Sequence, residues 1–337
     1  MKRTFIPPHY RPYVPGTDFS YVEKKSTVLS LNPIIILAVK EDIVPKEFMR
    51  ELGNDATRVS LLYYDDLGDS WDFAFYKGEL HLFQDNSKIK TIAIYHRHPG
   101  LKKSHPAYFK HLAFLEALEQ WNGKLVGQRH CHFQNSSKMY QMICSMQKAQ
   151  KETEEEEAVL PYSFFIKGHE KLAKQKLNSS LIVKSCSSHR SKVATREEFQ
   201  KWDREPMKHL PTLFQQHIKG SDLRVHVCDS IFWTLKVKNK DHVDYRYSTR
   251  GSVNYEHTKI SSGVQKFCKA LATKEKNSLV GIDFVHSDGK YYCLESNPGP
   301  GWSTFNHPSK TEFAYAVFFK LMPKSDPFEE LQGASNE

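Results

Sequence analysis

The chain has 337 residues, of which 39% are hydrophobic and 12% aromatic, so it can bury a substantial core and does not have a disordered composition. Its formal net charge of +9 favours anionic partners. No apolar run approaches the ~18 residues of a membrane span, no Lys/Arg block with interleaved aromatics indicates a nucleic-acid-binding module, and the basic N-terminus lacks the apolar segment of a secretory signal.

Cysteine usage favours a reducing compartment. The six cysteines are scattered without a CxxC pair, which is typical of free thiols in a cytoplasmic protein rather than of a disulfide framework. The sequence HCH at 130–132 suggests zinc. However, adjacent residues of a strand point to opposite faces, and no second ligand pair lies at the usual spacing, so we disfavour a zinc site.

The first part of the chain alternates strand and helix patterns. After a Pro- and Tyr-rich arm (1–28), a continuous apolar run at 32–39 predicts a strand covered on both faces. The alternation that follows predicts an α/β domain over 29–128. Its other predicted elements are a helix at 42–53, strands at 57–66 and 89–100, a hairpin at 71–83 around Lys77-Gly78, and a helix at 106–123.

Two further units are predicted, a small one at 129–212 and a larger one at 213–325, followed by a tail at 326–337. Alternating patterns dominate both units, and we find no internal repeat. The predicted elements are a helix at 136–150, strands at 161–166, 180–185 and 210–218, a long hairpin at 222–238, a helix at 263–275 and a second hairpin at 279–297.

The second hairpin contains the turn sequence HSDG at 286–289. We expect a three-residue loop with Gly289 in the left-handed conformation, which pairs His286 with Lys290. Counting back from that pair sets Asp283 opposite Cys293, and Glu295 then becomes the diagonal neighbour of Asp283.

Three oxygen-bearing side chains of this hairpin are expected on one face. Asn297 follows Glu295 by two residues and therefore shares a face with it and with Asp283. Mg²⁺ prefers such hard oxygen ligands, and carboxylates among apolar neighbours need a partner or a metal. A solvated strand face is the alternative interpretation of the same residues.

These motifs, in this order, resemble the ATP-grasp superfamily, and more narrowly the graspetide (microviridin-type) peptide ligases. The resemblance rests on the hairpin together with Lys138, Lys184, FQQHI at 214–218 and DLRVHV at 222–227. IAIYHRHP at 92–99, with Arg97, and DYR at 244–246 are similar to further elements of that family. The implied fold is α/β (α+β), with an α/β N-terminal domain, a central lid domain and a C-terminal mixed-sheet domain.

The resemblance also implies a role for each candidate site residue. Lysines act toward phosphate as point charges, and arginine can clamp oxygens with two nitrogens. The implied roles are α- and β-phosphate binding for Lys138 and Lys184, an adenine hinge for Gln215, Gln216, His217 and Ile218, γ-phosphate and acyl-phosphate contact for Arg224, substrate carboxylate binding for Arg246, and one or two Mg²⁺ ions for Asp283, Glu295 and Asn297. Without the resemblance, Lys138 could be an ordinary helix-surface lysine, and an exposed sheet face is the alternative to a polar site face for Arg224.

The implied activity is an ATP- and Mg²⁺-dependent ligase that forms an amide or ester through an acyl phosphate and releases ADP. An acidic precursor peptide or an amino-acid carboxylate is the expected substrate, because the chain is basic. One alternative is a small-molecule ligase of the glutathione-synthetase type. Another is an inactive nucleotide-binding scaffold, because the segment after Lys184 (185–193) contains no glycine. We expect no membrane or nucleic-acid partner and leave a homodimer open.

Overall fold

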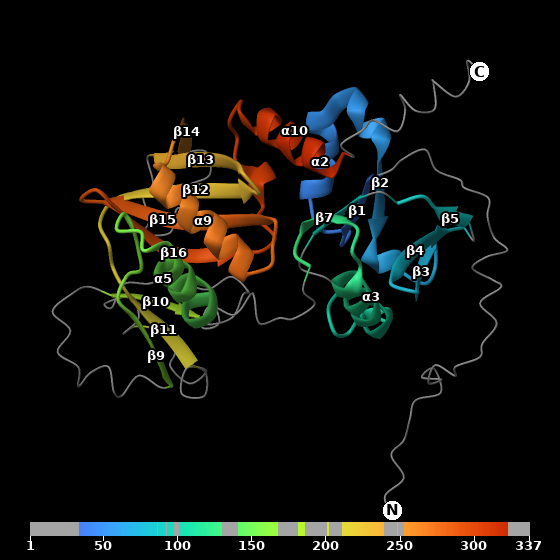
Figure 1. Cartoon of the computed structure of the whole chain (residues 1–337), viewed down its shortest axis with the longest axis horizontal. Coiled ribbons are helices and arrows are strands. Elements are labelled where there is room, and N and C mark those ends of the chain that lie inside the picture. The colour runs from blue at the N-terminus through green and yellow to red at the C-terminus, as the bar shows by residue number, and fades with distance from the viewer. Residues whose placement is uncertain are drawn as a thin grey trace, which may run out of the picture.

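The computed structural model contains four β-sheets flanked by helices (Figure 1). It describes residues 34–85, 87–91, 93–97, 101–129, 141–167, 181–185, 201, 211–238, 248 and 253–322, and the features below belong to these residues. Among them, no helix is long and apolar enough to cross a membrane.

The first sheet is fully parallel and has the strand order β2-β1-β6-β7. Its alternation with helices confirms the α/β character predicted for this part of the chain, while the predicted domain boundaries stay a prediction. The elements are β1 (Ile34–Ala38), α2 (Val44–Leu52), β2 (Val59–Tyr63), β6 (Ala93–His96), α3 (Tyr108–Gln120) and β7 (Lys124–Gly127).

Strand β1 is buried on both faces, as its continuous apolar run predicted. Ile34 and Ile36 pack in the same core as Phe48 of α2. Ile35 and Leu37 point the other way, into the core that α3 covers. Because successive side chains of β1 point to opposite faces of the sheet, the strand contributes to two cores.

A small antiparallel sheet, β3-β4-β5, follows β2. Its first turn is Lys77-Gly78, with positive φ angles of 52° and 81°, which confirms the predicted hairpin. The strands are β3 (Trp71–Tyr76), β4 (Glu79–Gln84) and β5 (Ser87–Ile89).

The next unit is a three-stranded antiparallel sheet with the order β10-β11-β9. It confirms the three strands predicted between 161 and 218. The helix predicted before it begins, within the described residues, as a π-helix. The elements are the π-helix Gln141–Met146, α5 (Gln147–Thr153), β8 (Ala158–Val159), β9 (Ser163–Lys167), β10 (Leu181–Ser185) and β11 (Pro211–Gln216).

The largest sheet has six strands in the order β14-β13-β12-β15-β16-β8. All its pairings are antiparallel except that of β16 with β8. Both predicted hairpins, β12–β13 and β15–β16, form here. The elements are β12 (Ser221–Cys228), β13 (Ile231–Lys238), β14 (Asn254–Thr258), α9 (Ser262–Lys274), β15 (Leu279–Ser287) and β16 (Lys290–Asn297).

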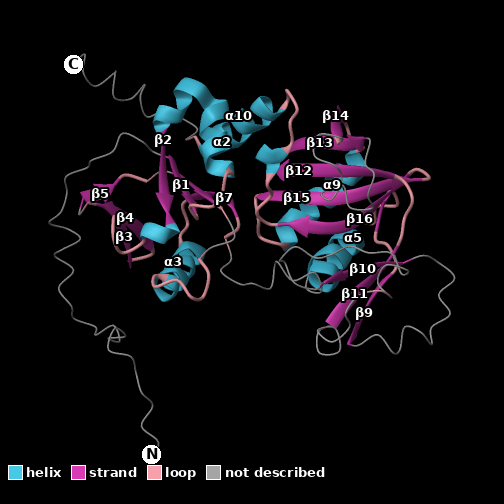
Figure 2. Ribbon diagram, turned by 180° about the vertical axis from the view of Figure 1, so that it is seen from behind, coloured by secondary structure: helices cyan, strands magenta, loops and turns pink. Residues whose placement is uncertain are grey.

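Helix α9 covers one face of the six-stranded sheet (Figure 1). Val225 and Val227 of β12 pack toward α9, in a core with Ile282 and Phe284. Arg224, which alternates with these valines, therefore belongs to the opposite face. The three-stranded sheet lies near β16, as both views show (Figures 1 and 2).

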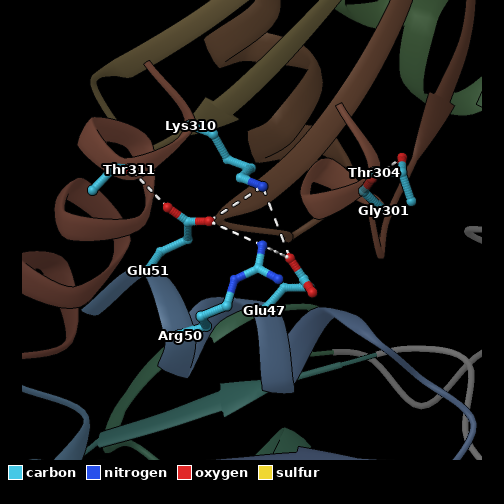
Figure 3. Close-up of polar contacts among 7 residues, drawn as sticks. All are labelled: Glu47, Arg50, Glu51, Gly301, Thr304, Lys310 and Thr311. Atoms are coloured by element: carbon cyan, nitrogen blue, oxygen red, sulfur yellow. Dashed lines mark hydrogen bonds and ion pairs between the residues drawn. The ribbon is translucent and has the colours of Figure 1, made fainter. Parts of the chain in front are cut away.

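Helix α10 (Lys310–Leu321) joins the parallel sheet to the six-stranded sheet, and its apolar residues share one core with both sheets. At its first turn, Lys310 Nζ lies 3.2 Å from Glu51 Oε1 and 3.8 Å from Glu47 Oε2 of α2, and Thr311 donates a hydrogen bond to Glu51 (Figure 3). Only 8% of the Lys310 surface is exposed, so its side chain is largely shielded from water, whereas the Thr311–Glu51 hydrogen bond is exposed.

Candidate active site

The β15–β16 hairpin turns through two residues, Asp288 and Gly289, whose φ angles are 51° and 73°. Two consecutive positive φ angles are typical of a type I′ turn, which matches the twist of the flanking strands. The observed pair at the turn is Ser287 with Lys290. The predicted three-residue loop, with His286 opposite Lys290, is therefore wrong.

A β-bulge then changes the register of the hairpin. Phe284 pairs with Cys293, but Asp283 pairs with Glu295, so Leu294 is the extra residue on β16. The predicted pairing of Asp283 with Cys293 is wrong, and Glu295 lies directly opposite Asp283 rather than diagonal to it.

The bulge resolves a conflict of side-chain direction. In an unbroken strand Cys293 and Glu295 would point to the same face. Cys293 is buried in the apolar core under α9, where an unpaired carboxylate would be costly. The extra residue lets Cys293 enter the core while Glu295 joins Asp283 on the other face.

Asp283 is the centre of a hydrogen-bonded group. Arg224, which pairs with Asp283 across β12 and β15, donates from Nη1 to Asp283 Oδ2 at 2.8 Å. Asn297 donates from Nδ2 to the same oxygen at 3.2 Å. The strand parity predicted for Asp283, Glu295 and Asn297 thus brings the carboxylates and the amide together.

Arg224 is itself oriented by a neutral histidine. Its Nε donates to His226 Nε2 at 3.4 Å, and the His226 ring stacks on Trp233 with centroids 5.0 Å apart. Burial, together with the nearby Arg224 charge, holds the pKa of His226 well below its usual value. His226 therefore accepts a hydrogen bond from the arginine without adding a second positive charge.

The three-stranded sheet brings a cation to this group from another part of the chain. Lys184 of β10 is 5% exposed, and its Nζ lies 3.8 Å from Glu295 Oε2. Gln215 of β11, also buried, donates from Nε2 to the carbonyl of Leu294, the bulge residue, at 3.5 Å. Both contacts place the three-stranded sheet against the bulged part of β16.

The roles of the remaining candidate residues stay predictions. Gln216, His217 and Ile218 lie half-buried on the segment that ends β11 and leads to β12, and the Gln216 backbone N–H donates to the carbonyl of Tyr162 at 2.7 Å. Their hinge role stays a prediction. Lys138, Arg246, the glycine-free segment from 186 onward and HCH at 130–132 lie outside the described residues.

The donor set suits a hard divalent cation. Two carboxylates and an amide oxygen are ligands that Mg²⁺ prefers. Within the described part of the chain, no three His, Cys, Asp or Glu side chains cluster as a metal site, and the hairpin set has two such side chains and an amide. Asp283, Glu295 and Asn297 therefore fit Mg²⁺ by their chemistry.

Two residues that the sequence did not single out shape the site. Gly281 lies so close to its surroundings that a Cβ atom there would be 2.3 Å from Arg224 Nη2 and 2.8 Å from Pro300 Cβ. Asn277, before β15, donates from Nδ2 to the carbonyl of Pro298 at 2.7 Å. A glycine inside a strand pattern often indicates close approach, and that signal could have identified Gly281.

Residues 147–302 match a family profile described as an ATP-grasp domain. The chain contains an ATP-grasp domain. The matched ATP-grasp segment includes the three-stranded sheet with Lys184 and the whole hairpin with Asp283, Glu295 and Asn297. No curated protein sequence is significantly similar to the chain.

Solved structures share the ATP-grasp fold at low sequence identity. The ligase PsnB complexed with a minimal precursor, Mg and ADP aligns with a TM-score of 0.63 and 18% identity, covering 88% of this chain and all of PsnB. The macrocyclase MdnC of Microcystis aeruginosa MRC, bound with precursor peptide MdnA, aligns at 0.64 and 14%, covering 86% and 100%. D-alanine–D-alanine ligase of Bacillus anthracis, complexed with ATP, aligns at 0.52 and 12%, covering 86% and 95%. The predicted fold class is confirmed.

Proposed function

We propose that the protein is an ATP-dependent ligase that activates a carboxylate as an acyl phosphate and joins it to an amine or hydroxyl. The observation that carries this proposal is the group formed by Lys184, Arg224, Asp283, Glu295 and Asn297. Two nearly buried cations face two carboxylates and an amide, with distances of 2.8 Å between Arg224 and Asp283 and 3.8 Å between Lys184 and Glu295.

The main obstacle of this chemistry is the repulsion between a carboxylate and a triphosphate, and the two cations reduce it. Arg224 has a forked group suited to phosphoryl and carboxylate oxygens, and Lys184 supplies a point charge. In the structure each is paired with a carboxylate. When ATP binds, we expect both cations to turn toward phosphate oxygens, while Asp283 and Glu295 become available to a cation.

Asp283, Glu295 and Asn297 would hold Mg²⁺, and Lys138 and Lys184 would contact the α- and β-phosphates. The backbone of Gln215–Ile218 would bind adenine, and Arg246 would bind the substrate carboxylate. A bound Mg²⁺ supplies neutralisation of the phosphate charge. The ATP is cleaved to ADP and phosphate overall: the γ-phosphoryl group passes to the carboxylate, and the incoming amine or hydroxyl then displaces phosphate.

We further propose that the substrate is a precursor peptide, with an Asp or Glu side chain as donor and a Lys, Ser or Thr side chain as acceptor. Two observations support this choice. The chain's net charge of +9 suits an acidic peptide, and solved structures of PsnB and MdnC, which share the fold, are complexes with precursor peptides. The described cysteines Cys144, Cys228, Cys268 and Cys293 are free thiols, which agrees with a reducing compartment.

A small-molecule ligase is the second candidate, because the D-alanine–D-alanine ligase fold also matches the chain. Incubation with ATP and Mg²⁺, together with either acidic peptides or free amino acids, distinguishes the two candidates. The substrate class that stimulates ADP release identifies the function. ADP supports acyl-phosphate chemistry, and AMP contradicts it. No turnover with any carboxylate would favour a nucleotide-binding scaffold.

The variant Glu295→Gln tests the site directly. It removes one charge without changing side-chain volume, so we expect ADP formation to fall about a hundredfold or more, as is typical when an electrostatic group at a reacting phosphate is lost. The required Mg²⁺ concentration should also rise. Glu79→Gln is the matched control, because the Glu79 side chain, at the start of β4, is 76% exposed. Unchanged turnover in Glu295→Gln, with both variants folded by circular dichroism, would remove Glu295 from the site.

A further inference from the structure

The parallel sheet has a topological switch point in its strand order, between β1 and β6. Its order β2-β1-β6-β7 means that the chain leaves β1 toward β2 on one side and returns to β6 on the other. Crevices at such a switch point, outside the carboxyl ends of the strands, are common binding places in α/β sheets. Asp42 follows β1 and Arg97 follows β6 directly, so an ion pair lies at this point.

The Arg97 guanidinium is held on two sides. Its Nε donates to Asp42 Oδ2 at 2.8 Å and its Nη2 to Asp42 Oδ1 at 3.3 Å. Asp42 is anchored in turn, because its Oδ1 accepts the backbone N–H of Val44 at the start of α2. Only 4% of Arg97 is exposed. The remaining nitrogen, Nη1, donates to the carbonyl of Pro300 at 2.9 Å.

Pro300 belongs to the loop 298–301, which leaves the hairpin directly after Asn297. Asn277 anchors its first residue through the carbonyl of Pro298, at 2.7 Å. Arg97 anchors the Pro300 carbonyl from the parallel sheet, at 2.9 Å. The loop is thus held from two elements far apart in the sequence.

Pro300 and Arg224 meet over Gly281. A Cβ on Gly281 would be 2.8 Å from Pro300 Cβ and 2.3 Å from Arg224 Nη2, so both groups occupy the space that a side chain would fill. Pro300 therefore limits the positions open to the Arg224 guanidinium, which contacts Asp283 at 2.8 Å, and a displaced Pro300 would leave that guanidinium without a fixed position when it turns toward phosphate.

We propose that Arg97, with Asp42, is a positioning residue of the ligase: it fixes Pro300 and thereby the Arg224 guanidinium. This proposal rests on the function inferred above, in which Arg224 faces the γ-phosphate. A buried ion pair adds little net stability compared with apolar residues of the same size, because desolvation offsets the attraction. Fixing the direction of the Pro300 carbonyl, by contrast, requires a guanidinium group whose own orientation is fixed, here by the two hydrogen bonds to Asp42.

The test replaces the pair by apolar residues, in the double variant Arg97→Met/Asp42→Leu, so that no buried charge is left uncompensated. Arg97→Lys, which keeps the charge and loses the fork, is the second variant. Arg50→Met, with an arginine side chain on α2 that is 64% exposed, is the matched control. Thermal unfolding reports stability, and calorimetry with Mg²⁺ reports the affinity for ADP and for the triphosphate analogue AMPPNP.

We expect the double variant and Arg97→Lys to lose at least about tenfold in AMPPNP affinity and in kcat for ADP formation, the size of one lost hydrogen bond to a charged group. The ADP affinity should stay unchanged, as should every value for Arg50→Met. A purely structural role would lower both nucleotide affinities together with the unfolding temperature. That result, or native AMPPNP affinity in both Arg97 variants, would overturn the proposal.

The wild type separates the two proposals. If it forms ADP, the proposed function stands whatever the Arg97 variants do. If it binds neither nucleotide, the proposed function is refuted and the positioning role with it.

Discussion

Glu275, at the C-terminal end of α9, tests the packing of α9 against β16, behind the candidate site. Its side chain is fully buried, and Oε2 accepts a hydrogen bond from Ser296 Oγ at 2.6 Å. Ser296 lies between Glu295 and Asn297 on β16 and pairs with Ile282, on the side of the sheet that α9 covers. Burial raises the pKa of Glu275 to about 8, although the Ser296 hydrogen bond acts in the opposite direction.

This raised pKa makes stability depend on pH with a definite sign. Below pH 4.5, the ordinary value, Glu275 is protonated in both the folded and the unfolded chain and makes no difference. Between pH 4.5 and about 8 the unfolded chain releases the proton while the folded chain keeps it, so stability falls as pH rises. The loss is about 1 kcal/mol for each pH unit, or a few kcal/mol across the window.

The variant Glu275→Gln resembles the protonated side chain at every pH. We therefore expect it to match wild type at pH 4.5 and to exceed it in stability by a few kcal/mol at pH 8. Urea unfolding at several pH values measures this difference, and Glu312→Gln, on the exposed side of α10, is the control. A stability difference between wild type and Glu275→Gln that stays flat from pH 5 to 8 would refute the reasoning.

Two glycine variants separate a site effect from a turn effect. Gly281→Ala should displace Arg224 or Pro300, which lie within 2.8 Å of the added Cβ, and so cost about 1–3 kcal/mol in urea unfolding and at least about tenfold in ADP formation; wild-type turnover would contradict the close packing. Gly289→Ala, at φ +73° in open space, should cost about 1 kcal/mol with turnover unchanged, because only the backbone conformation is strained. Equal loss of turnover in the two variants would mean that the hairpin, not the Arg224 contact, governs activity.

The local patterns of the sequence predicted most strands and helices, because burial imposes periods of two and 3.6 residues on neighbouring side chains. The apolar run of β1, the Lys77-Gly78 hairpin and the alternation of Arg224 with its valines are all of this kind. Helix α10 was not predicted. It is apolar on much of its surface, and its partners, α2 and two sheets, are supplied by segments far away in the chain.

The sequence by itself determined which groups the candidate site contains, since two carboxylates, an amide and cations of suitable chemistry are spaced along recognisable strands. Only the tertiary structure decided how they meet. Cys293 and Glu295 share strand parity, yet one is buried under α9 and the other faces Asp283, and the bulge at Leu294 that reconciles them follows from packing on both sides of the sheet. The ion pair of Lys184 with Glu295 joins two separate sheets, a contact that no local period encodes.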